Sequence, residues 1–434
     1  MLGLRGSAAV AEPTRKAKKS TEIARVIPDR LGAIRSVKFR ELRKLWDLAS
    51  VATMKKRTSI LKAATLAIAL ILPAAAVAET LVYFGTYTRG ESKGIYRSSL
   101  NEDTGALSEA VLVAEIASPS FLAIHPNGKF LYAVSEVAEF EAKPGGGVSA
   151  YAIGADGGLT LLNQRNSGGG APCHVSLDPS GKCVMVANYS GGSISVYPIE
   201  ADGKLGEVGS FVQHAGSSVH PKRQTAPHAH SINPDPSGKR AFVADLGLDQ
   251  VLIYNLDAAN GKVEANDPPF VKLPGATGPR HFSFHPNGKF AFTNLEMTLQ
   301  IAALSYDSKT GALAVIDTKS TVDEGTPQKG NSTAECLVHS SGKWVYVSNR
   351  GANSIAAFKI NQDTGKLTPI ERESTQGKTP RNFGIDPSGK FLIAANHSSN
   401  DVVVFKINQD TGELDPTGHK IAVPVSVCVR FLKK

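Results

Sequence analysis

The sequence predicts an all-β fold, a seven-bladed β-propeller, and three observations favour it. A short turn motif recurs about every 50 residues, strand-like segments flank each copy, and an unpaired strand-like segment stands at each end of the repeats. A fixed period of this length is typical of propeller blades, which are sheets of four strands. We therefore expect one propeller domain over residues 79–434.

The turn motif is a five-residue pattern of His or Asp, then Pro or Ser, then Asn or Ser, then Gly-Lys. Its glycines follow one another at intervals of 53, 57, 50, 54 and 47 residues. Pro fixes φ at the first central position of a turn, and Gly accepts a positive φ, so the motif predicts a tight turn. Apolar runs flank every copy, and each is expected to join the two inner strands of a blade. The copies begin at His125, Asp178, Asp235, His285, His339 and Asp386.

Two further strands are expected after each hairpin. In the second repeat they fall at residues 193–199 and 209–213. An Asp-Thr-Gly turn signal marks the same place in other repeats, at 103–105, 363–365 and 410–412. Each repeat therefore holds the four strands of a blade.

The two ends of the domain predict a seventh blade, closed by both termini. Residues 81–87 resemble a second strand with no first strand before them, and 95–100 and 110–116 supply the third and fourth. Residues 426–431 resemble an innermost strand with nothing after it. Pairing the two remainders completes one blade and removes the open sheet edges.

Residues 1–78 carry most of the positive charge of the chain. They contain 16 Lys and Arg against 5 Asp and Glu, so the formal net charge of +9 becomes −2 over residues 79–434. Binding to nucleic acid depends on a positive surplus, so we expect no nucleic-acid partner. The four cysteines fit no metal or haem motif and are expected to be buried and free, although a Cys173–Cys183 disulfide is the alternative.

A signal peptide is expected at residues 54–78. Met-Lys-Lys-Arg at 54–57 precedes a largely apolar run at 60–77, and Ala-Val-Ala ends it at 76–78. Residues 1–53 are then a mis-assigned or disordered extension. We expect a periplasmic or secreted protein with no membrane attachment once the leader is removed. A retained membrane anchor, or a cytoplasmic protein if the leader is misread, are the alternatives.

Candidate site residues stand where inner strands begin or second strands end, so that different blades can place them around one axis. Charges near an enclosed pocket are costly to bury unless they are paired or used. Asp245, Asn349, Asn382 and Asn396 occupy similar places, and bonding to backbone groups between blades is the simpler explanation for them. The candidates for function are His228, His230, Arg280, Glu296, Glu335, Arg350 and Arg381.

No metal or cofactor is expected. His228 and His230 would face the same side of a strand and could supply two metal ligands, but a third must come from elsewhere. The sequence has no Gly-x-Ser-x-Gly elbow and no glycine-rich phosphate loop before a helix.

An ordered set of short segments resembles the seven-bladed β-propeller lactonase family, which includes propeller-type 6-phosphogluconolactonases and carboxymuconate lactonizing (cyclase) enzymes. The resemblance extends over nearly all of residues 80–432. The segments are Phe-Gly-Thr-Tyr-Thr at 84–88, Lys-Gly-Ile-Tyr at 93–96, Pro-His-Ala-His at 227–230, Gly-Pro-Arg-His at 278–281, Tyr-Val-Ser-Asn-Arg-Gly at 346–351, Pro-Arg-Asn-Phe at 380–383 and Val-Cys-Val at 427–429.

The resemblance implies metal-independent hydrolysis of a small-molecule lactone in the central cleft, with a 6-phosphogluconolactonase-like enzyme as the first expectation. The family's proposed site matches His228 or His230, Arg280, Glu296 and Arg350 of this sequence. Our hypothesis is that Glu296 is the general base, that His230 or Arg280 stabilises the oxyanion, and that Arg350 and Arg381 bind a substrate anion, with His228 and Glu335 as further substrate contacts. Asn294-Leu295-Glu296 departs from the adjacent Asn-Glu of the family, which leaves the placement of Glu296 open.

A second hypothesis is a non-catalytic periplasmic propeller that binds a ligand or a protein, because fold alone does not fix function. Phosphorylated gluconolactone is a cytosolic metabolite, so an exported enzyme would act on a different sugar lactone.

Overall fold

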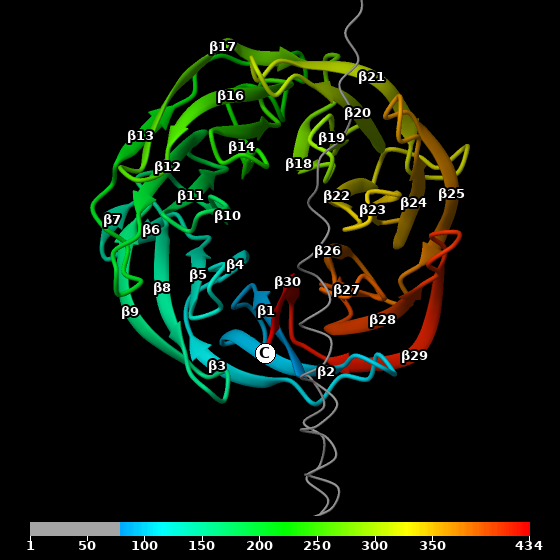
Figure 1. The fold of residues 1–434 in the computed structure, drawn as a ribbon, viewed down its shortest axis with the longest axis horizontal. Helices are drawn as coiled ribbons and strands as arrows, with labels where there is room; N and C mark the ends of the chain where they lie inside the picture. The colour runs from blue at the N-terminus through cyan, green and yellow to red at the C-terminus, as the bar shows by residue number, and fades with distance from the viewer. Residues whose placement is uncertain (1–78) are drawn as a thin grey trace, which may run out of the picture. The chain divides into compact units, whose positions relative to one another are not determined.

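The computed structural model describes residues 79–434; the expected extension and signal peptide lie outside the described residues. Seven sheets of four antiparallel strands surround one axis (Figure 1). No helix in this part of the chain is long and apolar enough to cross a bilayer. The predicted seven-bladed propeller is confirmed.

Each blade runs from an innermost strand beside the axis to an outermost strand at the rim, and the strands of each follow in that order. Blade 1 consists of β30 (Ser426–Lys433), β1 (Glu79–Thr86), β2 (Gly94–Asn101) and β3 (Val111–Glu115). Blade 2 consists of β4 (Leu122–Ile124), β5 (Phe130–Ser135), β8 (Gly147–Ile153) and β9 (Leu159–Asn166). Blade 3 consists of β10 (Pro172–Leu177), β11 (Cys183–Asn188), β12 (Ser193–Pro198) and β13 (Ser210–Gln213). Blade 4 consists of β14 (Ala229–Pro234), β15 (Arg240–Asp245), β16 (Gln250–Asp257) and β17 (Lys262–Lys272), and blade 5 of β18 (Pro279–Phe284), β19 (Phe290–Leu295), β20 (Gln300–Tyr306) and β21 (Leu313–Ser320). Blade 6 consists of β22 (Ser332–Val338), β23 (Trp344–Arg350), β24 (Ser354–Ile360) and β25 (Leu367–Ser374), and blade 7 of β26 (Pro380–Ile385), β27 (Phe391–Asn396), β28 (Asp401–Ile407) and β29 (Leu414–Ala422).

The recurring motif forms the turn between the two inner strands of each of blades 2 to 7, as predicted. Its glycines have φ between 66° and 73° in all six copies, a region that favours glycine. Where the motif begins with Asp, its carboxylate accepts hydrogen bonds from backbone amides at the start of the second strand. The Asp178 carboxylate, for example, accepts from the amide of Cys183 at 2.8 Å.

Where the motif begins with His, the side chain joins neighbouring blades. The Nε2 atoms of His125, His285 and His339 lie 2.9, 2.7 and 2.8 Å from the carbonyl oxygens of Gly181, Gly342 and Gly389. Each of those glycines belongs to the turn motif of the next blade. The motif therefore fixes the contact between blades as well as the turn.

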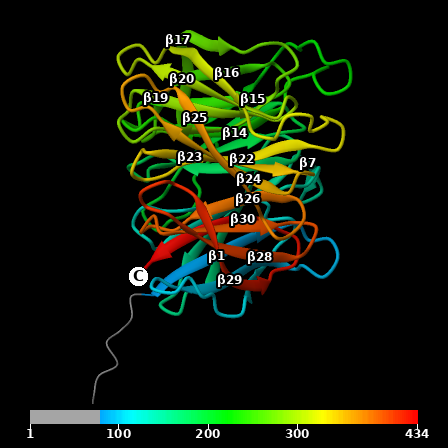
Figure 2. The same cartoon turned by 90° about the vertical axis from the view of Figure 1, so that its right-hand side faces the viewer.

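The two termini of the described chain close the ring in blade 1. Strand β30 pairs antiparallel with β1, with Val82 opposite Phe431 and Tyr83 opposite Arg430. Both strands run side by side next to the C-terminus in Figures 1 and 2. The predicted closure is confirmed, and β30 is the innermost strand of blade 1.

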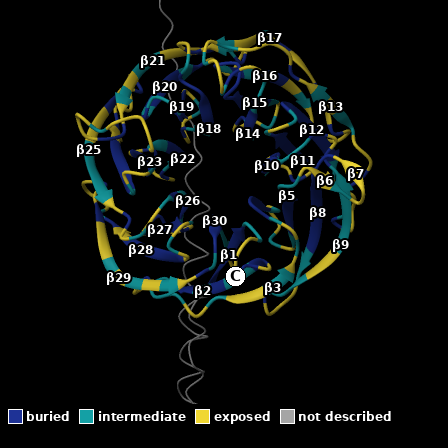
Figure 3. Ribbon diagram, turned by 180° about the vertical axis from the view of Figure 1, so that it is seen from behind, coloured by how far each residue is buried: buried dark blue, intermediate teal, exposed yellow. Residues whose placement is uncertain are grey.

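The core lies between adjacent sheets. Inner strands are buried almost throughout, whereas outer strands alternate exposed and half-buried residues (Figure 3). Phe292 of blade 5 packs with Phe358 of blade 6 in one apolar cluster, and corresponding clusters join other neighbouring blades. All four cysteines are buried and free, as expected.

Three departures from the repeat were not predicted. A two-stranded hairpin, β6 (Glu139–Phe140) and β7 (Lys143–Pro144), is inserted after β5. The connections 214–228 and 321–331 are longer than the other links between blades. The first links blades 3 and 4, the second links blades 5 and 6, and both reach Glu296 of blade 5.

Candidate active site

The candidate side chains gather at one end of the axis, where inner strands begin and second strands end. In blade 5, the amide of Glu296 donates to the carbonyl of Gly278 at 2.8 Å, and in blade 7 the amide of His397 donates to Thr379 at 3.0 Å. Equivalent backbone pairing recurs around the propeller and places one residue of each blade at this level. We call these seven residues the strand-end ring: Tyr87, Glu136, Tyr189, Leu246, Glu296, Arg350 and His397.

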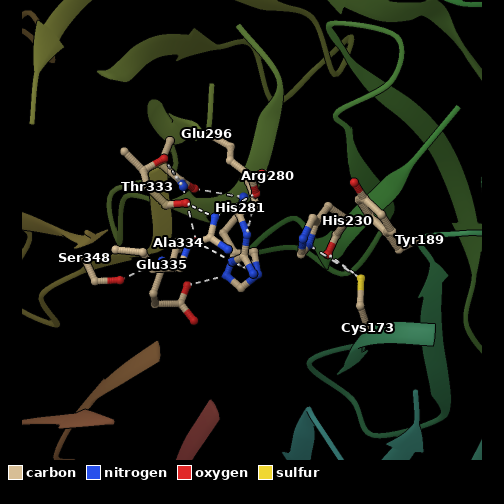
Figure 4. Close-up of polar contacts among 12 residues, drawn as sticks. Cys173, Tyr189, His230, Arg280, His281, Glu296, Thr333, Ala334, Glu335 and Ser348 are labelled. Atoms are coloured by element: carbon tan, nitrogen blue, oxygen red, sulfur yellow. Dashed lines mark hydrogen bonds and ion pairs between the residues drawn. The ribbon is translucent and has the colours of Figure 1, made fainter. Parts of the chain in front are cut away.

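The carboxylate of Glu296 is surrounded by three guanidinium groups. The Nη2 atom of Arg223 donates to Oε1 at 2.7 Å. Oε2 lies 3.1 Å from Nε of Arg280 and 3.0 Å from Nη2 of Arg350. The Arg280 contact (Figure 4) is a close ion pair rather than a hydrogen bond, because Nε makes no hydrogen bond of acceptable geometry. Glu296 thus occupies the ring in spite of the extra residue that separates it from Asn294.

These neighbours keep Glu296 ionised. Its side chain is only 6% exposed, and burial alone would raise its pKa. The charges of Arg350, Arg280 and Arg223 outweigh burial and lower the pKa to about 2. Glu296 is therefore a carboxylate at any pH near neutral.

Arg280 links this carboxylate to a layer of side chains closer to the middle of the axis. Its Nη1 atom donates to the carbonyl of Ala334 and lies 2.9 Å from Nε2 of His281. Burial, with the charges of Arg381 and Arg350, lowers the pKa of Arg280 to about 10, so the guanidinium stays charged near neutral pH. Figure 4 shows the sequence of contacts from Glu296 through Arg280 to His281.

Glu335 lies in that deeper layer, and both of its oxygens accept hydrogen bonds. Oε1 accepts from Nδ1 of His281 at 2.6 Å and from the amide of Cys336 at 2.8 Å, while Oε2 accepts from the amide group of Asn382. Burial and the charge of Arg280 lower the pKa of His281 well below its ordinary value, so its ring is neutral. Glu335 and His281 together hold Arg280 in place.

Arg381 differs from the other guanidiniums because it has no carboxylate partner. No side-chain hydrogen bond or ion pair of Arg381 to another residue of the range 79–434 is present, and its side chain faces the ring of Tyr87, at 5.4 Å. Burial opposes its charge, but Tyr87, Glu136 and Glu296 raise its pKa above the ordinary arginine value. Arg381 is thus a cation whose donors are free.

His230 lies between Cys173 and Tyr189, facing the arginine cluster (Figure 4). Its Nδ1 atom is 3.5 Å from Sγ of Cys173, and its ring meets Tyr189 edge-on at 5.1 Å. Burial and the charge of Arg280 lower the pKa of His230 well below its ordinary value, so it is neutral. Burial raises the pKa of Cys173, which is therefore a thiol and a poor nucleophile.

His228 stands apart from the charges. Its ring stacks on Tyr189 at 4.6 Å, and Nδ1 lies 3.0 Å from the carbonyl oxygen of Tyr189. The structure therefore brings Arg280, Glu296 and Arg350 into direct contact and places His230 beside them. His228 makes no hydrogen bond or ion pair with these three residues.

The four residues with a simpler structural explanation do bind backbone groups. Their partners are the amide of His228 for Asp245 (2.8 Å), the carbonyl of Thr321 for Asn349 (2.8 Å), the amide of Val429 for Asn382 (2.9 Å) and the carbonyl of Thr375 for Asn396 (3.1 Å). These bonds hold connections and neighbouring blades in register.

Sequence reasoning missed Arg223, Tyr189 and Glu136, and it did not assign a role to Tyr87. Tyr87, Glu136 and Tyr189 directly follow the second strand of a blade. Taking the residue after the second strand in every blade as a candidate would have found them. Arg223 lies in the irregular connection 214–228, where neither a repeat nor a motif marks it.

A cavity of about 360 Å³ opens beside Glu296. Its lining includes His220 and Arg223 from one long connection and Lys329 and Asn331 from the other. Within residues 79–434, no group of three or more His, Cys, Asp or Glu side chains is arranged to hold a metal ion. The cavity presents Arg223 and Lys329 as cations beside the Glu296 carboxylate, with amide groups of Gln328 and Asn331, a polar lining that suits an anionic or hydroxyl-rich small molecule.

The structure is thus a seven-bladed propeller in which buried arginine and glutamate side chains gather at one end of the axis. The family model described as "Lactonase, 7-bladed beta-propeller" matches residues 81–431. The chain belongs to this family.

Relatives and solved structures agree with that assignment. The chain is 38% identical over 352 residues to a 6-phosphogluconolactonase of Bacillus subtilis (strain 168), covering 81% of this chain and 97% of the relative. It is 34% identical to a 6-phosphogluconolactonase of Formosa agariphila, covering 70% and 86%. The structure of a periplasmic gluconolactonase of Pseudomonas aeruginosa is similar with a TM-score of 0.77 and 31% identity, covering 82% and 99%.

Proposed function

We propose that this protein hydrolyses a sugar lactone, in the manner of a 6-phosphogluconolactonase, at the strand-end ring. The observation that carries the proposal is the meeting of three guanidiniums, those of Arg223, Arg280 and Arg350, at Glu296, with Arg381, unpaired within residues 79–434, in their electrostatic reach. Lactone hydrolysis passes through an oxyanion and yields a carboxylate, and both are stabilised by fixed cationic donors.

Arg280 and His230 are the proposed oxyanion donors. Arg280 is held by His281 and Ala334, so its position costs little to maintain during the reaction. Neutral His230 can present an Nε2–H if its Nδ1 accepts the Cys173 thiol proton, since the two atoms are 3.5 Å apart. Both groups face the same space beside the ring.

Arg350 and Arg381 are the proposed anion-binding pair. Arg381 has free donors, and a guanidinium presents them in a fork that fits carboxylate or phosphate. His228, beside Tyr189, is proposed to border the substrate. Glu335 is proposed to act indirectly, because its contacts to His281 and Asn382 occupy its oxygens.

Glu296 receives a different role in this proposal from that of general base. A carboxylate with a pKa near 2 is a weak base, and its lone pairs face three guanidiniums. We propose that Glu296 gathers these groups and limits their mutual repulsion. The proposal requires no metal or cofactor.

We further propose that the enzyme works outside the cytoplasm, on a sugar lactone of the periplasm. The sequence of residues 54–78 supports export, and one relative is named a periplasmic gluconolactonase. A non-catalytic propeller that binds a sugar acid or a protein is the second candidate, because the same group of arginines suits binding alone.

A lactone panel tests the proposal. The purified protein would be assayed with glucono-δ-lactone, 6-phosphogluconolactone and an aromatic-derived muconolactone, with and without EDTA, against the spontaneous rate. We expect turnover of at least one sugar lactone that EDTA leaves unchanged. Saturable binding of gluconate without acceleration of any lactone would favour the binding protein, and EDTA-sensitive turnover would contradict metal independence.

A further inference from the structure

The strand-end ring contains a second carboxylate, Glu136, in blade 2. Its amide donates to the carbonyl of Ser118 at 2.9 Å, the backbone bond that defines the ring. Glu136 is half-buried, and no ion pair of this carboxylate is present in the described range. It therefore has lone pairs that a water molecule can reach, in contrast to Glu296.

Tyr87, also in the ring, fixes the orientation of this carboxylate. The phenol oxygen of Tyr87 lies 2.9 Å from both Oε1 and Oε2 of Glu136, so its O–H donates across the two oxygens. Each carboxylate oxygen has two lone-pair directions, and one on each oxygen stays available. Tyr87 is itself held between cations, with the guanidinium of Arg89 at 4.6 Å and that of Arg381 at 5.4 Å from its ring.

Arg381 lies within the electrostatic reach of both carboxylates. Its charge is stabilised by Glu136 and Glu296 together, and Arg280 and Arg350 feel its repulsion. A lactone whose carbonyl oxygen approaches Arg381 therefore comes within the electrostatic reach of both Glu136 and the guanidinium-bound Glu296. Only the Glu136 side offers a carboxylate without a cation hydrogen-bonded to it.

We propose that Glu136 is the general base of the lactone hydrolysis and that Tyr87 is its positioning residue. This inference rests on the proposed function. A water molecule bound to Glu136 attacks the carbonyl carbon, its proton passes to the carboxylate, and the carbonyl electron pair moves to the oxygen beside Arg280 and Arg381. Collapse of this intermediate breaks the ring C–O bond, and the leaving alkoxide takes the proton from Glu136. One water is consumed, and the product is an open hydroxy acid.

The test compares Glu136→Gln and Tyr87→Phe with Glu139→Gln, a matched change at an exposed position three residues away in β6. Each variant would be assayed for kcat and KM from pH 4 to 9, with thermal unfolding as the check on the fold. We expect Glu136→Gln to lower kcat by about 100-fold or more, as loss of a general base does, with KM changed by less than about threefold. Glu139→Gln should match the wild type.

The pH profile separates positioning from structure. The charged or titratable groups that face Glu136 are Tyr87, Cys173 and Arg381. Removing the Tyr87 hydroxyl withdraws a hydrogen bond to the ionised carboxylate, so in Tyr87→Phe the acidic limb of kcat should move to higher pH. A merely structural role for Tyr87 would lower kcat and leave the limb in place, and that result would overturn its assignment.

The outcomes distinguish this inference from the proposed function. If the wild type accelerates no lactone, the proposed function fails. If the wild type is active and Glu136→Gln keeps kcat within about threefold, Glu136 is not the base and the lactonase proposal stands. If Glu136→Gln does not fold, Glu136→Asp and Tyr87→Phe take its place in the test. We expect Glu136→Asp to retain part of kcat and to lose it at low pH as the wild type does. A kcat that does not fall at low pH in either variant would contradict the inference.

Discussion

At the scale of single residues, the site depends on which charges are paired and which are free. Glu296 neutralises one guanidinium of three, and Arg381 is not paired at all within the described range. The strand-end positions of Arg280, Arg350 and Arg381 could be predicted from the hairpin pattern, and the resemblance supplied their chemistry. Arg223, which contacts Glu296 from connection 214–228, could not be predicted, because the path of an irregular loop decides whether its side chain reaches Glu296.

Substituting Glu296 with Gln should weaken both stability and activity. The folded-state pKa of Glu296 is lowered from 4.5 to about 2, so its ionised form contributes stability that is complete above pH 4.5 and is lost as the pH falls toward 2. That shift corresponds to about 3 kcal/mol. Glu296→Gln should lose roughly this much free energy of unfolding at pH 7, and on the order of 100-fold in kcat/KM as the guanidiniums separate.

Urea unfolding at several pH values measures the first effect, and Glu264→Gln, at an exposed position of β17, is the control. The free energy of unfolding of the wild type should fall more steeply between pH 4.5 and 2 than that of Glu296→Gln. Parallel curves for the two proteins would show that the three guanidiniums do not stabilise this carboxylate.

At the scale of elements, the repeated turn controls both the hairpin and the contact between blades. Pro and Gly act locally, so the turn could be predicted from the sequence. The bond from the His ring to the next blade could not be predicted, because the repeat shows only that either His or Asp stands at this position. The β6–β7 hairpin and the two long connections were missed for a related reason: they interrupt the repeat, and the repeat was the main signal.

Replacing His285 with Ala should destabilise the propeller without affecting catalysis. The change removes the 2.7 Å bond to the carbonyl of Gly342, an oxygen that keeps its bond from Gln362 at 2.9 Å, so the cost is that of one hydrogen bond, about 1 kcal/mol. The turn lies at the opposite end of β18 from the strand-end ring, so kcat should be unchanged. Thermal unfolding and lactonase assays check both parts, with His419→Ala as the control, since the His419 ring makes no hydrogen bond within residues 79–434. Wild-type stability for His285→Ala would argue that the His ring does not join the blades.

At the scale of the whole molecule, ring closure places residues from Tyr87 to His397 at one level around a single axis. The pairing of β1 with β30 completes blade 1 and fixes its position against blades 2 and 7. The closure could be predicted because each end of the sequence lacked a partner strand. Which ring positions form a reactive site could not be predicted, since the seven equivalent positions carry five different residue types and no pattern distinguishes the reactive ones.

A structure with the reaction product bound tests the central claim most directly. Crystals would be grown with gluconate and, separately, with 6-phosphogluconate. We predict the product at the strand-end ring, with an anionic group within about 3 Å of the Arg381 guanidinium and the sugar chain between Glu136 and Arg280. Product bound only on the outer strands, or bound at the axis with Arg280, Arg350 and Arg381 uncontacted, would contradict the account.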